Sequence, residues 1–178
     1  KVIAASRDLQ PGDPLDPATR MGAIVDDVQL KTVLGYIEAG REDGATILAG
    51  GRRARQETGG FYVEPTIFSD VRQQMRIARE EIFGPVLAAI TVKDAEEAVR
   101  VGNSVIYGLA AAIWTRDITR AHRMARALRS GMVYVNCYDA DDITVPFGGF
   151  KQSGTGRDKS LHAFDKYTEL KTTWIDLS

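Results

Sequence analysis

The stretch "GLAAAIWTRDITRAHRMARALRSGMVYVN", residues 108–136, decides the fold class. Both ends are apolar runs of strand length, and Asp117 between them can cap a helix that runs from Ile118 to Arg129 and ends at Gly131. Upstream, "PVLAAITV" at residues 85–92 is a nearly continuous apolar run, a pattern typical of a strand covered on both faces. Because strands and helices alternate over short connections, the sequence predicts an α/β domain with a parallel sheet.

Further elements are expected on either side of this stretch. An apolar stripe predicts a helix from Asp27 to Asp43 that ends at Gly44, and Asp94 with Glu97 matches a capping box. Strands are expected at 45–51 and 60–71, where Pro65 indicates a bulge or an edge position, and a short helix at 159–164. The helical stripe consists of Val28, Leu30, Val33, Leu34 and Ile37.

The final segment "TELKTTWIDL", residues 168–177, alternates like a strand but has no obvious pairing partner in the sequence. We therefore expect it to pair at an edge with another subunit.

Composition excludes several classes of protein. The 178 residues suit one domain with a proper core, and 44% hydrophobic and 26% charged residues are ordinary for a globular protein. Because 23 basic residues face 24 acids, no net field favours nucleic acid or an anionic membrane. The basic stretch 119–129 has apolar residues at helical spacing, so we interpret it as a solvated helix face. No apolar run is long enough to cross a bilayer.

The stretch "AREEIFGPV", residues 78–86, places two carboxylates directly before a predicted strand. One interpretation makes Glu81 a turn carboxylate bonded to nearby amides. The other uses the rule that ligands of open α/β sheets lie beside strand ends, where a carboxylate can accept both hydroxyls of a ribose. Phe83 would then offer a ring face to a flat heterocycle.

Cys137 is the one cysteine, which excludes an internal disulfide and a cysteine-built metal site and suits a reducing cytoplasm. As a nucleophile it would need a base, and neither His122 nor His162 has a triad-like context. A small, inert, buried cysteine is the favoured interpretation. Asp139, Asp141 and Asp142 are either solvated loop acids or groups that attract a cationic ligand end.

The glycine-rich stretch "GGFKQSGTGRD", residues 148–158, lacks the spacing of a P-loop. We interpret it as a loop whose glycines let two chain segments approach closely.

Taken together, the ordered motifs from Gln10 to Leu177 resemble the C-terminal part of the NAD(P)-dependent aldehyde dehydrogenase superfamily. The segment from Asp141 to Thr172 resembles the branch that oxidises γ-glutamyl-γ-aminobutyraldehyde in putrescine utilisation. The motifs are "PGDPLDPATRMG", "GYIEAGREDGATILAGG", "GFYVEPTIFSDV", "AREEIFGPVL", "NSVIYGLAAAIWTRD", "SGMVYVNCYD", "PFGGFKQSGTGRD" and "YTELKTTWIDL".

This resemblance implies a three-layer parallel-sheet catalytic domain, of which residues 1–166 are the C-terminal portion, and an oligomerisation strand and tail at 167–178. It implies NAD or NADP as cofactor, with Glu81 accepting from the nicotinamide ribose hydroxyls and Phe83 packing beside the nicotinamide. Self-association as a dimer or tetramer is also implied, through the C-terminal strand.

On the substrate side, the resemblance implies a wall formed by Pro146, Phe147, Gly148 and Gly149. The position of Asp141 resembles one that lines the aldehyde entrance, often with an aromatic residue, and an acid there would suit an aminoaldehyde. The family's nucleophilic cysteine, oxyanion asparagine, glutamate base and Rossmann-like domain all precede Lys1 in the motif order. We therefore expect no catalytic residue and no metal site here, and no catalysis by this chain alone.

Two rival functions remain open at this point. The chain could be a binding or assembly module that keeps the fold without chemistry. It could also be a cysteine hydrolase that uses Cys137, which would need a histidine base near the thiol.

Overall fold

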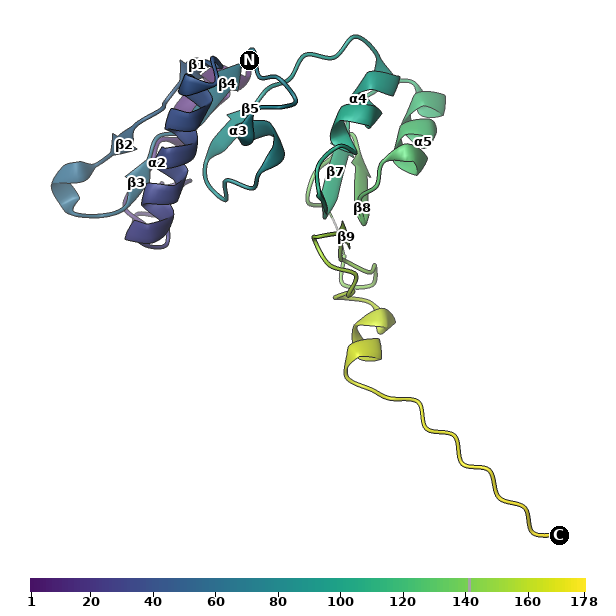
Figure 1. The fold of residues 1–178 in the computed structure, drawn as a ribbon. Helices are drawn as coiled ribbons and strands as arrows, with labels where there is room; N and C mark the ends of the chain where they lie inside the picture. The colour runs from purple at the N-terminus through teal and green to yellow at the C-terminus, as the bar shows by residue number, and fades with distance from the viewer. Residues whose placement is uncertain (141) are drawn as a thin grey trace. The chain divides into compact units, whose positions relative to one another are not determined.

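The computed structural model describes residues 1–140 and 142–178. The chain divides into two compact units, an N-terminal unit at Lys1–Val92 and a C-terminal unit at Lys93–Ser178. Each unit has its own helices and strands (Figure 1), and each is described by itself.

The N-terminal unit is built on a three-stranded sheet with the order β1-β4-β5. Strand β1 is antiparallel to β4, β4 is parallel to β5, and β2 and β3 form a separate antiparallel pair. Its elements are α1 (Val2–Ser6), η1 (Arg7–Leu9), α2 (Asp27–Glu42), β1 (Thr46–Ala49), β2 (Arg53–Ala54), η2 (Gln56–Thr58), β3 (Tyr62–Val63), β4 (Thr66–Ser69), α3 (Arg76–Arg79) and β5 (Val86–Ala88).

Helix α2 confirms the predicted helix at this position. The side chain of Asp26 accepts a hydrogen bond of 2.7 Å from the backbone N–H of Gln29, and Gly44 follows the helix with φ at +86°. Leu30 belongs to the buried face, but Val28 is 72% exposed, so its predicted place in the stripe is wrong. Two residues turn a helix by about 200°, which places Val28 on the opposite side from Leu30.

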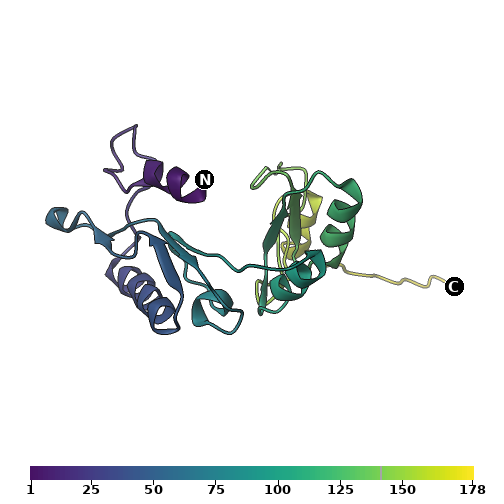
Figure 2. The same cartoon turned by 90° about the horizontal axis from the view of Figure 1, so that it is seen from above.

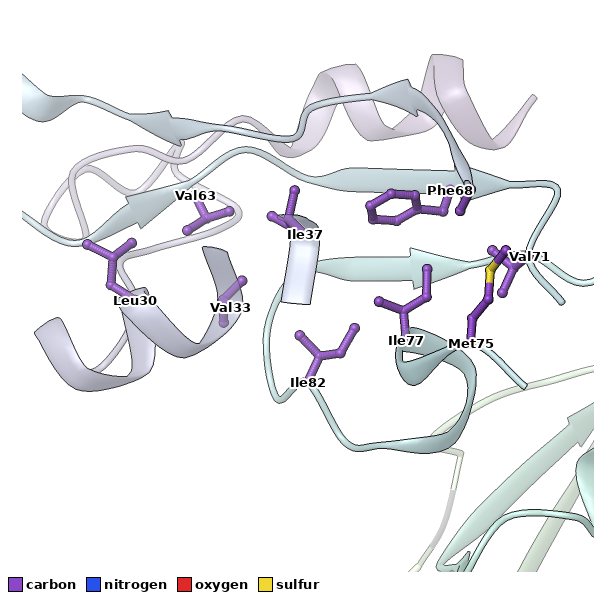
Figure 3. Close-up of a cluster of buried hydrophobic side chains, with 10 residues drawn as sticks. Leu30, Val33, Ile37, Val63, Phe68, Val71, Met75, Ile77 and Ile82 are labelled. Carbon is purple, nitrogen blue, oxygen red and sulfur yellow. The ribbon is translucent and has the colours of Figure 1, made fainter. Parts of the chain in front are cut away.

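The core of the N-terminal unit lies between α2, α3 and the sheet (Figure 3). Phe68 on β4 is completely buried at its centre. A Cβ at Gly40 would lie 2.9 Å from the Phe68 ring, so the glycine lets the helix approach the sheet closely. The buried members are Leu30, Val33, Ile37, Ala45, Val63, Phe68, Val71, Met75, Ile77 and Ile82.

Two strand predictions in this unit need correction. Pro65 falls between β3 and β4, so the expected stretch at 60–71 is two short strands in different sheets. Strand β5 is shorter than the apolar run at 85–92, and Leu87 within it is 48% exposed, so the expected coverage of both faces is absent in the described residues. The reason is that Val86 and Ala88 pack against the core cluster, so that Leu87 between them points to the opposite face of the sheet.

In the C-terminal unit, helix α5 packs against α4 and against the parallel strands β7 and β8 (Figure 2). Strand β6 is antiparallel to β9. The elements are α4 (Ala95–Gly102), β6 (Tyr107–Gly108), β7 (Ala110–Ile113), α5 (Ile118–Ala127), β8 (Met132–Val135), β9 (Phe150–Lys151) and η3 (Leu161–Lys166). The parallel strand–helix–strand unit predicted from residues 108–136 is thus confirmed.

Side-chain caps begin both helices of this unit as predicted. Asp94 accepts from the backbone N–H of Glu97 at 2.8 Å, and Asp117 accepts from that of Arg120 at 3.0 Å. Helix α5 ends at Ala127, before the predicted Arg129. The side chain of Asn103 explains this end, because it donates to the carbonyl of Ala127 and accepts from the N–H of Arg129. The arginines of α5 are exposed and Ala121 is buried, which confirms a solvated helix face.

Residues 167–178 form no helix or strand, and their side chains are exposed. The final strand predicted at 168–177 therefore has no paired counterpart among the described residues. No helix of the described residues is long and apolar enough to span a bilayer. The same residues contain no cluster of three or more His, Cys, Asp or Glu side chains that could hold a metal ion.

Candidate functional site

Two adjacent carboxylates between α3 and β5 have opposite surroundings. The Oε2 atom of Glu80 accepts from the phenol of Tyr36 at 2.9 Å and from Nη2 of Arg76 at 3.2 Å. The carboxylate of Glu81 is exposed and has no hydrogen bond or ion pair with any residue that the structure describes. One acid of the pair is thus held by the protein, and the other is exposed without a partner among the described residues.

The next two residues alternate in the same way. Ile82 is 9% exposed and points into the core cluster beside Ile37 and Ile77 (Figure 3). Phe83 is 78% exposed and has φ at +53°, a left-handed conformation that is uncommon for a bulky residue. A strained backbone persists only where its surroundings impose it, and it often marks a functional site.

Helix α2 supplies the surroundings that impose this conformation. The amide Nε2 of Gln29 donates to the carbonyls of both Ile82 and Phe83 at 3.0 Å. Val33, one helical turn further on, packs so closely that a Cβ at Gly84 would lie 2.5 Å from its Cγ2 atom. We name residues 80–84 the presenting loop, because Glu80, Ile82 and Gly84 hold it while Glu81 and Phe83 remain exposed.

The hydrogen bonds of the presenting loop shift the pKa values of its anchor. The Arg76 guanidinium, followed by the Tyr36 phenol, lowers the pKa of the Glu80 carboxyl. The hydrogen bond to Glu80 raises the pKa of Tyr36, and it also raises the pKa of Arg76. A lowered carboxyl pKa means that this contact stabilises the folded chain above the ordinary carboxyl pKa and is lost as the pH falls through the lowered value.

A second predicted site segment lies in the C-terminal unit, around Phe147. An antiparallel bridge holds this residue, since Phe147 and Asp158 exchange two backbone hydrogen bonds of 2.8 and 2.7 Å. The ammonium of Lys159 lies 5.6 Å from the centre of the Phe147 ring, within the range of a cation–π contact. Pro146 beside it is exposed, whereas Phe147 is half-buried.

Glycines bring the backbone around this segment into close contact, as predicted. A Cβ at Gly131 would lie 1.8 Å from the carbonyl oxygen of Gly148, and one at Gly148 would lie 2.1 Å from that of Gly156. Arg157 donates to the carbonyls of Gly149, Thr155 and Gly156, which fixes the turn. These contacts leave no room for any other residue type at Gly131 or Gly148 without movement of the backbone.

An apolar hollow of about 640 Å³ lies in the same region, between residues 143–144 and the segment 159–164. The backbone N–H of Ser160 donates to the carbonyl of Ile143 at 2.7 Å and holds its two sides together. Leu161 and Phe164 contribute apolar surface. Asp141, predicted at the aldehyde entrance, lies outside the described residues.

Cys137 is exposed, so the prediction of a buried cysteine is wrong. Its exposure follows from Asn136, which ends β8 with φ at +57° and turns the chain out of the sheet. The amide of Asn136 makes two hydrogen bonds of 2.9 Å with the backbone of Thr115, which fix this turn. His162 lies 3.2 Å from the carboxylate of Asp165 within η3.

The structure thus groups the predicted site residues into two sets. Glu81 and Phe83 lie together on the presenting loop, and Pro146 and Phe147 lie together in the C-terminal unit. Sequence reasoning missed Gln29, Tyr36, Arg76 and Glu80. The pair Arg76–Glu80 has the i, i+4 spacing of a helical ion pair, which was a detectable signal.

Comparison with known proteins agrees with this fold. The model of the aldehyde dehydrogenase family matches residues 1–173, and the chain belongs to that family. It is 50% identical over 172 residues to the NADP/NAD-dependent aldehyde dehydrogenase PuuC of Escherichia coli K12, covering 97% of this chain and 34% of PuuC.

Two solved structures are also similar. A mutant of the P. syringae indole-3-acetaldehyde dehydrogenase AldA, in complex with NAD+ and IAA, is 64% identical with a TM-score of 0.96, and the match covers 99% of this chain and 36% of AldA. The γ-glutamyl-γ-aminobutyraldehyde dehydrogenase of Burkholderia cenocepacia J2315 is 60% identical with a TM-score of 0.93, covering 97% of this chain and 35% of that enzyme. The chain therefore spans about a third of the length of these relatives.

Proposed function

We propose that this chain is part of an NAD(P)+-dependent oxidoreductase that converts an aldehyde to a carboxylic acid, and that it contributes residues that bind the nicotinamide end of the cofactor. The observation that carries this proposal is the presenting loop, where Glu81 is exposed without a described partner and Phe83 projects beside it. A carboxylate next to an exposed ring matches the hydroxyl pair of a ribose and the flat face of a nicotinamide. The relative AldA, solved with NAD+, supports the same cofactor.

When bound, the dinucleotide supplies the hydride acceptor of the reaction. The contribution of this chain is positional: the two oxygens of Glu81 would accept from the ribose hydroxyls, and the ring of Phe83 would limit the movement of the nicotinamide. Because the hydride acceptor is already aligned with the substrate, less entropy has to be lost on the way to the transition state. PuuC is named NADP/NAD-dependent, and we propose one or both of these dinucleotides here.

The chemical steps of the reaction would be carried out by residues that do not belong to this chain. We propose that residues 1–166 belong to the catalytic domain of a cytoplasmic enzyme, and that the nucleophile, the base and the Rossmann-like domain are supplied by other residues, so that this chain alone is inactive. Residues 167–178 would pair as a strand with a second subunit of a dimer or tetramer. The exposure of Leu170, Trp174 and Leu177 supports this role for the segment.

For the substrate, we propose an aminoaldehyde, with Pro146 and Phe147 on the wall of its pocket. The support is the relative that is named a γ-glutamyl-γ-aminobutyraldehyde dehydrogenase. Asp141 would attract the amine end by charge pairing. An Asp141→Asn variant of the natural gene product should lose preference for amino over plain aliphatic aldehydes, whereas Asp139→Asn, which removes an equal charge from the same loop, should not. Equal preferences in all three proteins would contradict this role.

The experiment that tests the proposed function uses the natural gene product that contains this chain. Aldehyde oxidation is followed as NADH or NADPH formation with aminoaldehydes and plain aldehydes, in the unaltered protein and in Glu81→Gln. We expect oxidation by the unaltered protein and an apparent affinity for the dinucleotide about tenfold weaker in Glu81→Gln, since one charge-assisted acceptor is lost. Absence of both oxidation and dinucleotide binding would favour the non-catalytic module instead.

A further inference from the structure

We propose that Tyr36, Arg76 and Glu80 form a positioning device that fixes the carboxylate of Glu81 for the cofactor, with Gln29 as a second anchor. This inference rests on the proposed function and deepens it. Tyr36 lies seven residues after Gln29 on α2 and three after Val33, and positions i, i+4 and i+7 share one helical face. One face of α2 thus contacts the presenting loop at its first residue, at two carbonyls and at Gly84.

The three anchor groups also hold one another. The guanidinium of Arg76 lies 5.1 Å from the centre of the Tyr36 ring and donates to the same Glu80 oxygen as the phenol. Arg76 belongs to α3 and Tyr36 to α2, so their contact joins the two helices that flank the loop. These contacts therefore favour one orientation of the Glu80 side chain, and they restrict the backbone that continues into Glu81.

The two adjacent acids have different roles: Glu80 holds the presenting loop, and Glu81 would bind the dinucleotide. Without the contacts of Glu80 to Tyr36 and Arg76, the carboxylate of Glu81 would still be present. Its side chain and backbone would then have to become ordered when the dinucleotide binds. Ordering a long side chain and its backbone costs free energy at the moment of binding, which appears as weaker affinity. The positioning device removes this cost before the dinucleotide binds. Its loss should therefore weaken the binding of the cofactor more than it slows a reaction at saturating cofactor.

The test measures NAD+ affinity and turnover in the natural gene product with Tyr36→Phe, which removes one hydroxyl and keeps the ring. We expect the dissociation constant for NAD+ to rise by about 2- to 5-fold, the size typical of an exposed charge-assisted contact, with kcat at saturating NAD+ unchanged. Glu38→Gln is the matched control, because it removes an exposed carboxylate that pairs with Arg41 on the same helix and makes no hydrogen bond or ion pair with the presenting loop among the described residues. It should leave both constants unchanged.

A second variant shows whether the hydroxyl acts through Glu80. In a Glu80→Ala background, Tyr36→Phe should have no further effect on NAD+ affinity, since the group it contacts is gone. Faster amide hydrogen exchange at residues 80–84 in Tyr36→Phe, and not in Glu38→Gln, would confirm the loss of positioning.

Two results separate the failure of this inference from that of the proposed function. If Glu81→Gln weakens NAD+ binding but Tyr36→Phe and Glu80→Ala do not, the positioning device is overturned and the cofactor site stands. If Glu81→Gln binds NAD+ like the unaltered protein, both are overturned.

Discussion

The two predicted site segments are held by different means. Side chains from two helices hold the presenting loop at residues 80–84. The segment around Phe147 is held mainly by its own chain, through the backbone bridge to Asp158, the hydrogen bonds of Arg157 and close packing at glycines. A side-chain clamp can be loosened one hydrogen bond at a time. The backbone contacts have no such gradation, because a side chain added at Gly131 or Gly148 would overlap a carbonyl oxygen. The difference predicts that variants of the two segments fail in different ways.

The largest effect is expected at Gly131. A Gly131→Ala variant places a methyl group 1.8 Å from the carbonyl oxygen of Gly148. Overpacking typically costs about 1–3 kcal/mol, and here the free energy of unfolding should fall by at least about 3 kcal/mol because the atom that is struck belongs to the backbone. Site-resolved amide hydrogen exchange in β7 and β8 measures the loss. Gly156→Ala is the control, since a Cβ there meets nothing within 4 Å. Equal exchange in the two variants would contradict close backbone packing.

A smaller but substantial effect is expected at Ile82, the apolar anchor of the presenting loop. Ile82→Ala leaves a cavity in the core cluster, and the unfolding free energy of the N-terminal unit should fall by about 2–3 kcal/mol. We place it toward the low end of the range for such substitutions, because a loop can partly close on the cavity. Amide exchange in α2 and β4 reports it. Val28→Ala, at an exposed position of α2, should cost little, and a similar cost at both positions would refute the anchor.

Lys151 combines the two kinds of contact, because its side chain donates hydrogen bonds to backbone carbonyls. Its ammonium donates to the carbonyls of Asn103 and Val105 at 2.9 and 3.0 Å, where α4 has ended. Lys151→Met keeps the unbranched apolar stem but removes the ammonium, and should cost about 1 kcal/mol, as expected for lost hydrogen bonds at a partly buried site. Thermal unfolding of the C-terminal unit measures it. Amide exchange at residues 103–106 should become faster in Lys151→Met but not in Lys159→Met, and faster exchange there in both variants would refute the specific contact.

The smallest effect is a change in titration at Glu80. Because Arg76 and Tyr36 lower its pKa, the carboxyl should titrate below the ordinary value of about 4.3. Tyr36→Phe should move the midpoint upward, since one donor to the charged form is lost. A carboxyl-carbon NMR titration measures both proteins. An unchanged midpoint would show that the phenol does not bind the carboxylate in solution.

Part of this organisation could be predicted from the sequence. The caps at Asp94 and Asp117 and the stop at Gly44 depend on contacts within a few residues, so local spacing reveals them. Sequence spacing also indicated that the glycines around residue 148 allow close approach. The family motif pointed to Glu81 and Phe83, although which of the two adjacent acids is held by the protein became visible only in the fold.

The misplacement of Val28 was a local error of helix geometry, whereas the remaining misses arise from contacts between distant parts of the chain. Gln29 reaches carbonyls 53 and 54 positions away, which no local pattern reveals. Leu87 is exposed because it points to the face opposite the core cluster, and which face is covered is a property of the whole fold. Cys137 was expected to be buried because no base accompanies it and a free cysteine packs as a small apolar residue, but the turn at Asn136 depends on a side-chain contact with Thr115.

The most direct test of the central claim is an experimental structure of the natural gene product with NAD+ bound. We predict both oxygens of Glu81 within hydrogen-bonding distance, about 3 Å, of the two hydroxyls of the nicotinamide ribose, with Glu80 still hydrogen-bonded to Tyr36 and Arg76. A bound dinucleotide whose ribose hydroxyls lie away from Glu81 would contradict it.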